Sequence, residues 1–245
     1  MRPHVFLALA AFASAASQVT AQASDSGHDM HGEQMLFWGA GAEIDHAEQD
    51  WLSDAEGSLA TWDGYAWIGD DDLKLRLEAE GEAEDGDIDH SELKTLLSWN
   101  VDEFWDLQAG ARLDLEDGGN TWAAFGVHGM MPYFIETDAF AYVDRDGNVA
   151  FHAAYEMDFA VTQDIFIQPQ VEIEAFAQDM PERGVGEGLS DLTLGLQLRY
   201  EITRKLAPYV EVVHERALGE TSQIMQDNGE DPESTTIRFG LRFRP

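Results

Sequence analysis

The hydrophobic positions of this chain recur every second residue over many short stretches. In SDLTLGLQLRYEI, residues 190–202, Leu194, Leu196 and Leu198 alternate with polar or small residues. A period of two is typical of an extended strand with one apolar and one polar face. In a soluble sandwich the apolar face forms the core, whereas in a membrane barrel it contacts lipid and the polar face lines the interior.

The alternating stretches repeat along the whole chain, and about twelve of them are separated by turn residues. Their length of about ten residues suits a tilted strand that crosses a bilayer, whereas soluble strands usually have about five or six. We therefore predict an all-β fold, a transmembrane antiparallel β-barrel of about twelve strands. The predicted strands are 35–46, 60–68, 73–81, 89–99, 105–115, 122–131, 134–143, 149–161, 166–178, 190–201, 207–218 and 235–243.

The polar faces of these stretches carry both acidic and basic residues. In LKLRLEAEGE, Lys74 and Arg76 share a face with Glu78, opposite the leucines. Facing bulk water they would be ordinary solvated surface, but inside a lumen they would form a charge-paired network. The barrel interpretation turns the leucines of 190–202 toward lipid and three charged residues toward the lumen: Asp191, Arg199 and Glu201.

The connections between the stretches alternate in length, as in outer-membrane barrels with short periplasmic turns and longer outer loops. Short breaks are predicted near Gly69, Asn100, Pro132, Thr162 and Thr203, and tight glycine turns at Asp117 and Asp146. Longer acidic loops are predicted near Asp50, Asp85, Asp179 and Asp227.

Aromatic residues gather near the predicted strand ends, where a membrane barrel carries interfacial girdles; packing in a core is the alternative. They are Phe37, Trp38, Trp62, Trp67, Trp99, Phe104, Trp105, Trp122, Tyr133, Phe134, Phe166, Tyr200 and Tyr209.

The first residues predict export. A basic Arg2, a short apolar run and the small-x-small site ending at Ala23 indicate a secretory signal peptide over residues 1–23. Residues 24–35 are polar and predicted to form a flexible periplasmic arm, and residues 36–245 the barrel. No later stretch approaches 18 consecutive apolar residues, so no spanning helix is predicted. The predicted location is the outer membrane of a Gram-negative bacterium.

The charge balance limits the classes of molecule that the protein can bind. The chain has 48 acidic and 14 basic residues, a formal net charge of −34, and no cysteine. Nucleic acid is excluded as a partner, because binding phosphates requires a basic surface. The acidity favours cations, either as diffuse counterions or as bound metal ions. The absence of cysteine excludes disulfides and thiolate metal sites.

No common catalytic motif is present, neither a nucleophile elbow nor a zinc-protease, P-loop or dinucleotide-binding pattern. Ser190 with His214 is a conceivable pair, but the alternation places His214 in register with Val210 and Val212. We therefore predict that the protein is not an enzyme.

The metal-binding candidate is the segment HDMHGEQM in the arm. His28, Met30, His31 and Met35 lie close together there. Imidazole suits copper in either oxidation state and the methionine thioether favours Cu(I). His128, Met130 and Met131 near the periplasmic rim are interpreted as packing residues, since methionine often fills gaps. His152 is expected to join the lumenal network.

Several longer motifs resemble those of the copper-resistance protein B family of bacterial outer-membrane proteins. They are TWDGYAWIGDDDLKLRLEAEGE, QPQVEIEAFAQD, PERGVGEGLSDLTLGLQLRYEI and APYVEV, within a resemblance that covers most of the chain after Met35. The family implies a barrel that binds copper and supports copper tolerance beside periplasmic copper-handling proteins. Its members often carry a longer Met/His-rich arm, of which only HDMHGEQM is matched here.

Residues and resemblance together predict an outer-membrane copper-binding protein. Copper ions would be collected by the Met/His arm at an acidic barrel, contributing to copper homeostasis or resistance, with lipid around the barrel. A general cation-selective channel without specific copper binding is the alternative.

Overall fold

The computed structural model describes residues 36–48, 57–115 and 119–245, and Leu36–Pro245 is one compact unit. Its elements are β1 (Phe37–Glu48), β2 (Ser58–Gly69), β3 (Leu73–Glu84), β4 (Asp87–Asp102), β5 (Trp105–Asp114), β6 (Thr121–Met131), β7 (Ile135–Asp144), β8 (Val149–Glu156), β9 (Phe159–Ala160), β10 (Ile165–Phe176), η2 (Pro181–Arg183), β11 (Gly188–Tyr200), β12 (Leu206–Ala217), α2 (Gly219–Asn228) and β13 (Glu233–Phe243).

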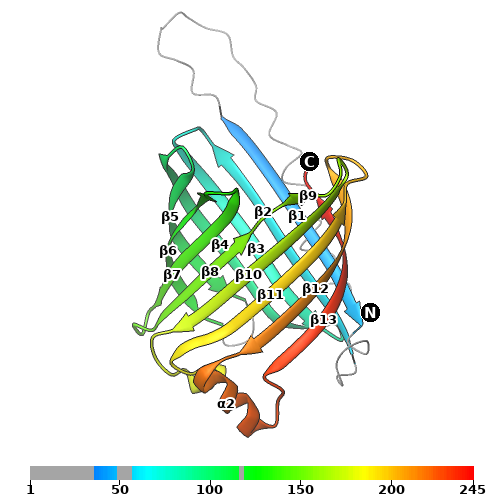
Figure 1. Ribbon diagram of the computed structural model, residues 1–245. Helices are drawn as coiled ribbons and strands as arrows, with labels where there is room; N and C mark the ends of the chain where they lie inside the picture. Colours follow the sequence, from blue (N-terminus) through cyan, green and yellow to red (C-terminus); the bar gives the residue numbers. More distant parts are fainter. Residues whose placement is uncertain (1–35, 49–56, 116–118) are drawn as a thin grey trace, which may run out of the picture. The chain divides into compact units, whose positions relative to one another are not determined.

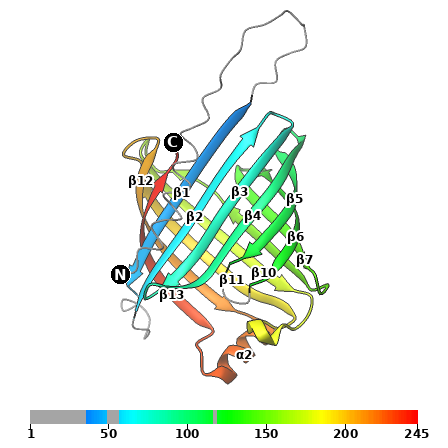
Figure 2. The same ribbon diagram turned by 180° about the vertical axis from the view of Figure 1, so that it is seen from behind.

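The strands form a closed antiparallel barrel, as Figures 1 and 2 show from opposite sides. Strands that follow one another in the chain pair with each other, except that β8 and β9 each pair with β10; β1 pairs with β13 to close the ring. The predicted strand 149–161 is divided into β8 and the short β9, which both pair with β10 and together occupy one position in the wall. The prediction of twelve strands is thereby confirmed. Closure satisfies every edge, which a sheet in lipid requires.

The leucines of β11 point outward and its polar residues inward. Leu196 is 52% exposed on the outer surface, whereas Arg199 is only 2% exposed and lies in the interior. A soluble sandwich would bury the leucines instead. The predicted orientation is therefore confirmed, and the outer apolar surface is the one that contacts lipid. No helix in the described part of the chain is long and apolar enough to span a bilayer.

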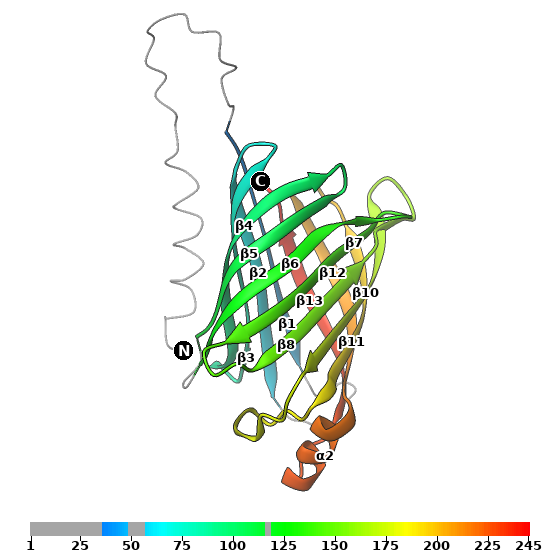
Figure 3. The same cartoon turned by 90° about the vertical axis from the view of Figure 1, so that its left-hand side faces the viewer.

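The two ends of the barrel differ. The chain enters β1 and leaves β13 at the same end, uppermost in Figure 1, where the connections between strands are short. The opposite end carries α2 and the η2 segment, side by side in Figure 3. Because outer-membrane barrels have short periplasmic turns and longer outer loops, we assign the upper end to the periplasm and the α2 end to the outside.

One prediction about the outer loops was wrong. The connection at Asp85 is a two-residue turn, in which Asp85 and Gly86 have φ angles of 49° and 88°. An Asp-Gly pair with positive φ at both positions makes a tight hairpin, so β3 and β4 continue further than predicted. The connection near Asp227, between Ala217 and Glu233, is long as predicted, and the structure adds the helix α2 within it.

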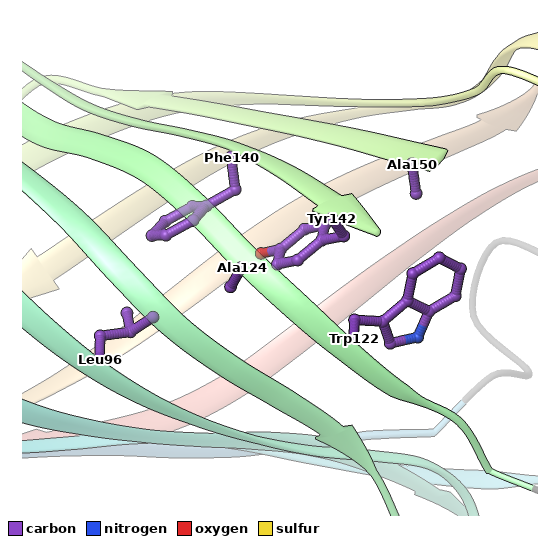
Figure 4. Close-up of a cluster of buried hydrophobic side chains, with 6 residues drawn as sticks. All are labelled: Leu96, Trp122, Ala124, Phe140, Tyr142 and Ala150. Carbon is purple, nitrogen blue, oxygen red and sulfur yellow. The ribbon is translucent and has the colours of Figure 1, made fainter. Parts of the chain in front are cut away.

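Several aromatic residues near strand ends are exposed, among them Trp38, Trp99 and Tyr200, but some of the predicted girdle residues face the interior. Trp122 and Tyr209 are buried inside the barrel, and the Arg199 guanidinium lies over the Phe166 ring, 5.2 Å from its centroid. Trp122 belongs to an apolar cluster on the inner wall, shown in Figure 4. The cluster comprises Leu96, Trp122, Ala124, Phe140, Tyr142 and Ala150. Packing with other side chains, the alternative interpretation, therefore applies to these inward residues.

Candidate functional site

The lumen is lined by a network of paired charges, as the alternation predicted. The inward basic residues are Lys74, Arg76, Lys94, Arg112, Arg199, Arg238 and Arg242, and each lies within ion-pair distance of a carboxylate. The inward carboxylates outnumber them: Glu43, Asp45, Asp63, Glu78, Glu80, Glu82, Glu92, Asp106, Asp114, Glu136, Asp138, Glu156, Glu172, Glu174, Asp191, Glu211 and Glu215. The lumen is thus acidic overall, which favours cations over anions.

The most buried part of this network lies in the wall formed by β4 and β5. Glu92 is 2% exposed and accepts contacts from Lys94 and Arg112, each at 2.7 Å. Arg112 also reaches Asp114 at 2.8 Å. Charged groups removed from bulk water are tolerated only when their partners surround them, and here carboxylates and bases alternate along the wall.

A second group of contacts centres on Gln168 of β10 and joins it to both neighbouring strands and to β13. Gln168 of β10 accepts hydrogen bonds from Arg199 at 2.9 Å and from Arg242 at 3.0 Å, and it donates one to Glu156 at 2.5 Å. Arg242 also pairs with Glu43, its direct cross-strand neighbour on β1. Arg242 therefore links the seam between the first and last strands to β10, past the intervening strands β11 and β12.

Replacing Arg242 by methionine should weaken barrel closure. The β1–β13 ladder has five register pairs against twelve between β1 and β2, so a side-chain link at the seam matters. We expect a loss of about 1–2 kcal/mol, because Glu43 and Gln168 each lose a hydrogen-bond donor. The measurement is the temperature at which the folded barrel unfolds on a gel. Arg244→Met, just beyond β13, is the control, and equal unfolding temperatures for both variants would contradict the expectation.

His128 and His152 also face the lumen. His128 Nδ1 lies 2.8 Å from Asp138 Oδ1, and its Nε2 lies 3.4 Å from Arg76 Nη1. His128 is therefore held in the charge network, where rim packing was predicted. His152 Nε2 lies 4.0 Å from Glu172 Oε2, which confirms that it joins the lumenal network.

The described residues form a hollow on each face of the barrel wall. The larger, of about 610 Å³, is lined mainly by outward side chains such as Leu107, Phe125 and Phe151, so it belongs to the lipid-facing surface. The smaller, of about 150 Å³, lies inside the outer end of the lumen and is called the mouth cavity here. Its lining includes His90, Arg112, Trp122, Tyr142, His152, Glu174, Phe176 and Arg183.

Among the described residues of the outer loops, Asp179 and Glu220 form a close pair of carboxyl groups. Asp179, in the β10–β11 connection, hydrogen-bonds to Glu220 of α2 and raises the pKa of Glu220, since two negative charges disfavour each other there. Glu187 raises this pKa further. The pair is stable while one proton is shared, so this contact weakens as the pH rises and Glu220 ionises.

The predicted ligands His28, Met30, His31 and Met35 lie outside the described residues. Within residues 36–48, 57–115 and 119–245, no group of three or more His, Asp or Glu side chains is close enough to hold a metal ion. Ser190 and His214 are not brought together, because Ser190 is buried in the interior whereas His214 contacts Thr235 on the outer face at 2.9 Å. The mouth cavity was missed, because nothing in the alternation indicates which inward residues meet across the barrel.

These features define a class, the outer-membrane β-barrels with a charged lumen. Among solved structures, the chain is similar to the NanC porin, with a TM-score of 0.55 at 10% identity over 84% of this chain and 98% of the porin. At that identity the likeness shows the fold alone. The protein lies in the outer membrane.

Comparison of the sequence with known protein families identifies the family. Residues 40–244 match the family described as copper resistance protein B precursor, and the chain belongs to it. A copper resistance protein B homolog from Pseudomonas syringae pv. tomato is 34% identical over 229 residues, which are 93% of this chain and 76% of the relative. Copper resistance protein B from Escherichia coli is 34% identical over 79% of this chain, and the chain spans 66% of that relative. Membership supports a role in copper resistance, and the resemblance found in the sequence is confirmed.

Proposed function

We propose that this protein binds copper ions at the periplasmic side of the outer membrane and thereby contributes to copper homeostasis. The ligands we assign are His28, Met30, His31 and Met35. Family membership over residues 40–244 carries the copper assignment. The Met/His arm adds ligands of the right chemistry, since thioether and imidazole groups together select copper among the common divalent and monovalent ions.

The barrel contributes an acidic lumen to this function. Its carboxylates outnumber its guanidinium and ammonium groups, so the local concentration of cations near the lumen is raised. Copper is the cargo of this system. The basic residues are tied to carboxylates at distances such as 2.8 Å between Lys74 and Asp106, so they repel cations less than free bases would. Periplasmic copper-handling proteins are the partners that this function calls for.

A general cation-selective channel is the second candidate. The observation that favours it is the lumen itself, which is acidic along its length and needs no arm to attract cations. This candidate predicts an ion conductance that stays unchanged when residues 24–35 are removed, and no copper-specific effect. We propose no catalytic role, since Ser190 and His214, the pair considered from the sequence, are not brought together.

The test is copper tolerance in a strain that lacks the gene. Complementation with the full chain should restore growth on copper, whereas a chain lacking residues 24–35 should restore it only in part or not at all. Gels that separate folded from unfolded barrel compare the amount of folded protein from both chains. This comparison separates loss of function from loss of assembly. If both chains restore tolerance equally, the arm is not the copper site. If neither does, the function itself is wrong.

A further inference from the structure

The connection between β10 and β11, residues 177–187, reaches into the outer mouth of the barrel. Arg183 Nη2, at the end of η2, lies 2.6 Å from Asp114 Oδ2 on β5. In the sheet, β5 is separated from β10 by β6, β7 and β8. The contact therefore bridges the mouth between walls that are not neighbours. Figure 3 shows this segment in yellow beside α2 at the outer end.

The same segment packs on the inner wall of the barrel. Phe176 and Met180 lie against the apolar cluster that contains Trp122 and Tyr142. The Arg183 guanidinium lies over the Trp122 ring, 5.6 Å from its centroid. An exposed loop that simply returned to the next strand would leave these contacts unmade. Apolar and ionic contacts together hold the connection inside the mouth.

Both ends of the segment are anchored while its middle crosses the mouth. Gln178 Oε1 accepts a hydrogen bond from the Val149 backbone at 3.0 Å, and the Gly186 backbone donates one to Thr221 Oγ1 of α2 at 3.1 Å. Gly184 and Gly188, with φ angles of 71° and 105°, flank the stretch that leads back to β11. The part that carries Arg183 is thus a short strap between fixed points.

The ion pair at the centre of this strap can break without leaving a buried charge alone. When Arg183 withdraws, Asp114 keeps its contacts with Arg112 at 2.8 Å and with the Trp122 indole at 2.9 Å. The Arg183 side chain is already 28% exposed, so it can return to water. Breaking a buried pair is costly mainly when one partner is left uncompensated, and neither partner is left so here.

We propose that residues 177–187 form a lid over the outer mouth, latched by Arg183 to Asp114, and that release of this latch opens the mouth cavity to the outside. Arg183 lines that cavity together with His90, His152 and Glu174, so its movement removes part of the roof. The lid controls entry into the lumen whether or not copper is the cargo.

The test uses a single reporter cysteine, because the chain has none of its own. Ala150 lines the mouth cavity and is buried beneath the lid, so Ala150→Cys should react slowly with a membrane-impermeant thiol reagent added outside. Adding Arg183→Gln should speed labelling about tenfold, since a hydrogen bond to a charged group shifts a closed–open equilibrium by that order. Arg216→Gln is the control, because Arg216 is exposed on the outer face at the same end.

A second measurement is the conductance of the purified full-length protein in a planar bilayer. Arg183→Gln and Asp114→Asn should each raise the conductance or the open fraction. The double variant should match Arg183→Gln, since that substitution alone already breaks the ion pair that the two residues share. If the Asp114→Asn variant fails to assemble, the labelling rate and conductance of the Arg183→Gln variant alone still test the lid. Labelling rates and conductance equal to those of Arg216→Gln would overturn the lid.

Discussion

Replacing His28, Met30, His31 and Met35 together by alanine is expected to abolish high-affinity copper binding by the purified, detergent-solubilised protein. These four side chains supply all the imidazole and thioether groups between residues 24 and 35. Alanine offers no ligand atom, so the affinity of the arm for Cu(I) should fall by at least about two orders of magnitude. A titration against a competing Cu(I) chelator measures the change, and the unfolding temperature of the barrel should not move.

Two control variants sharpen this result. Ser24, Ser26 and Gln34 replaced by alanine alter the same arm without removing a soft ligand, so copper binding should persist. His128 and Met130 replaced by alanine remove the imidazole and thioether on the lumenal side of β6. If copper binding survives in the variant that lacks His28, Met30, His31 and Met35 but disappears in the variant that lacks His128 and Met130, the copper site lies in the barrel and our assignment is contradicted.

Placing arginine at position 196 is expected to prevent stable assembly. Leu196 is exposed on the outer face of β11 and its cross-strand neighbour on β12, Val212, is exposed there too. An arginine on the lipid side of a barrel strand costs about 2–4 kcal/mol near the bilayer midplane and less toward the interfaces. Gels that separate folded from unfolded barrel should show mainly unfolded protein for Leu196→Arg.

The matched control is Thr193→Arg on the same strand but on the other face. Its cross-strand neighbours are Glu172 on β10 and Glu215 on β12, so the new guanidinium finds carboxylate partners in the lumen. This variant should assemble normally. If the two variants fold equally well, the outer face of β11 does not contact hydrocarbon and the orientation of the whole wall is wrong.

The contrast between these two positions shows what the alternation could predict. Period two gives the face of each side chain, so the outward Leu196 and the inward Arg199 were predicted correctly. Position along a strand predicts less well. Trp122 lies near a strand end as a girdle residue would, yet its face turns it inward to hydrogen-bond Asp114 at 2.9 Å.

Contacts between distant strands could not be predicted. Arg183 and Asp114 are 69 residues apart in sequence, and their meeting depends on how the barrel closes and how one loop folds back. The Asp85–Gly86 turn, by contrast, carries a local signal, since Asp-Gly between alternating strands favours a tight hairpin. The arm residues His28 to Met35 have no such periodic pattern, so their assignment depends on ligand chemistry and family alone.

The end of the barrel at which β1 begins decides on which side of the outer membrane the preceding segment enters the barrel. The described chain starts at Leu36, beside the first residue of β1, at the end with the short turns. A segment of twelve residues before it extends at most roughly 40 Å. An ion bound by the proposed ligands of that segment would therefore stay on the periplasmic side of the outer membrane, where a bulky chelator confined to the medium would not reach it.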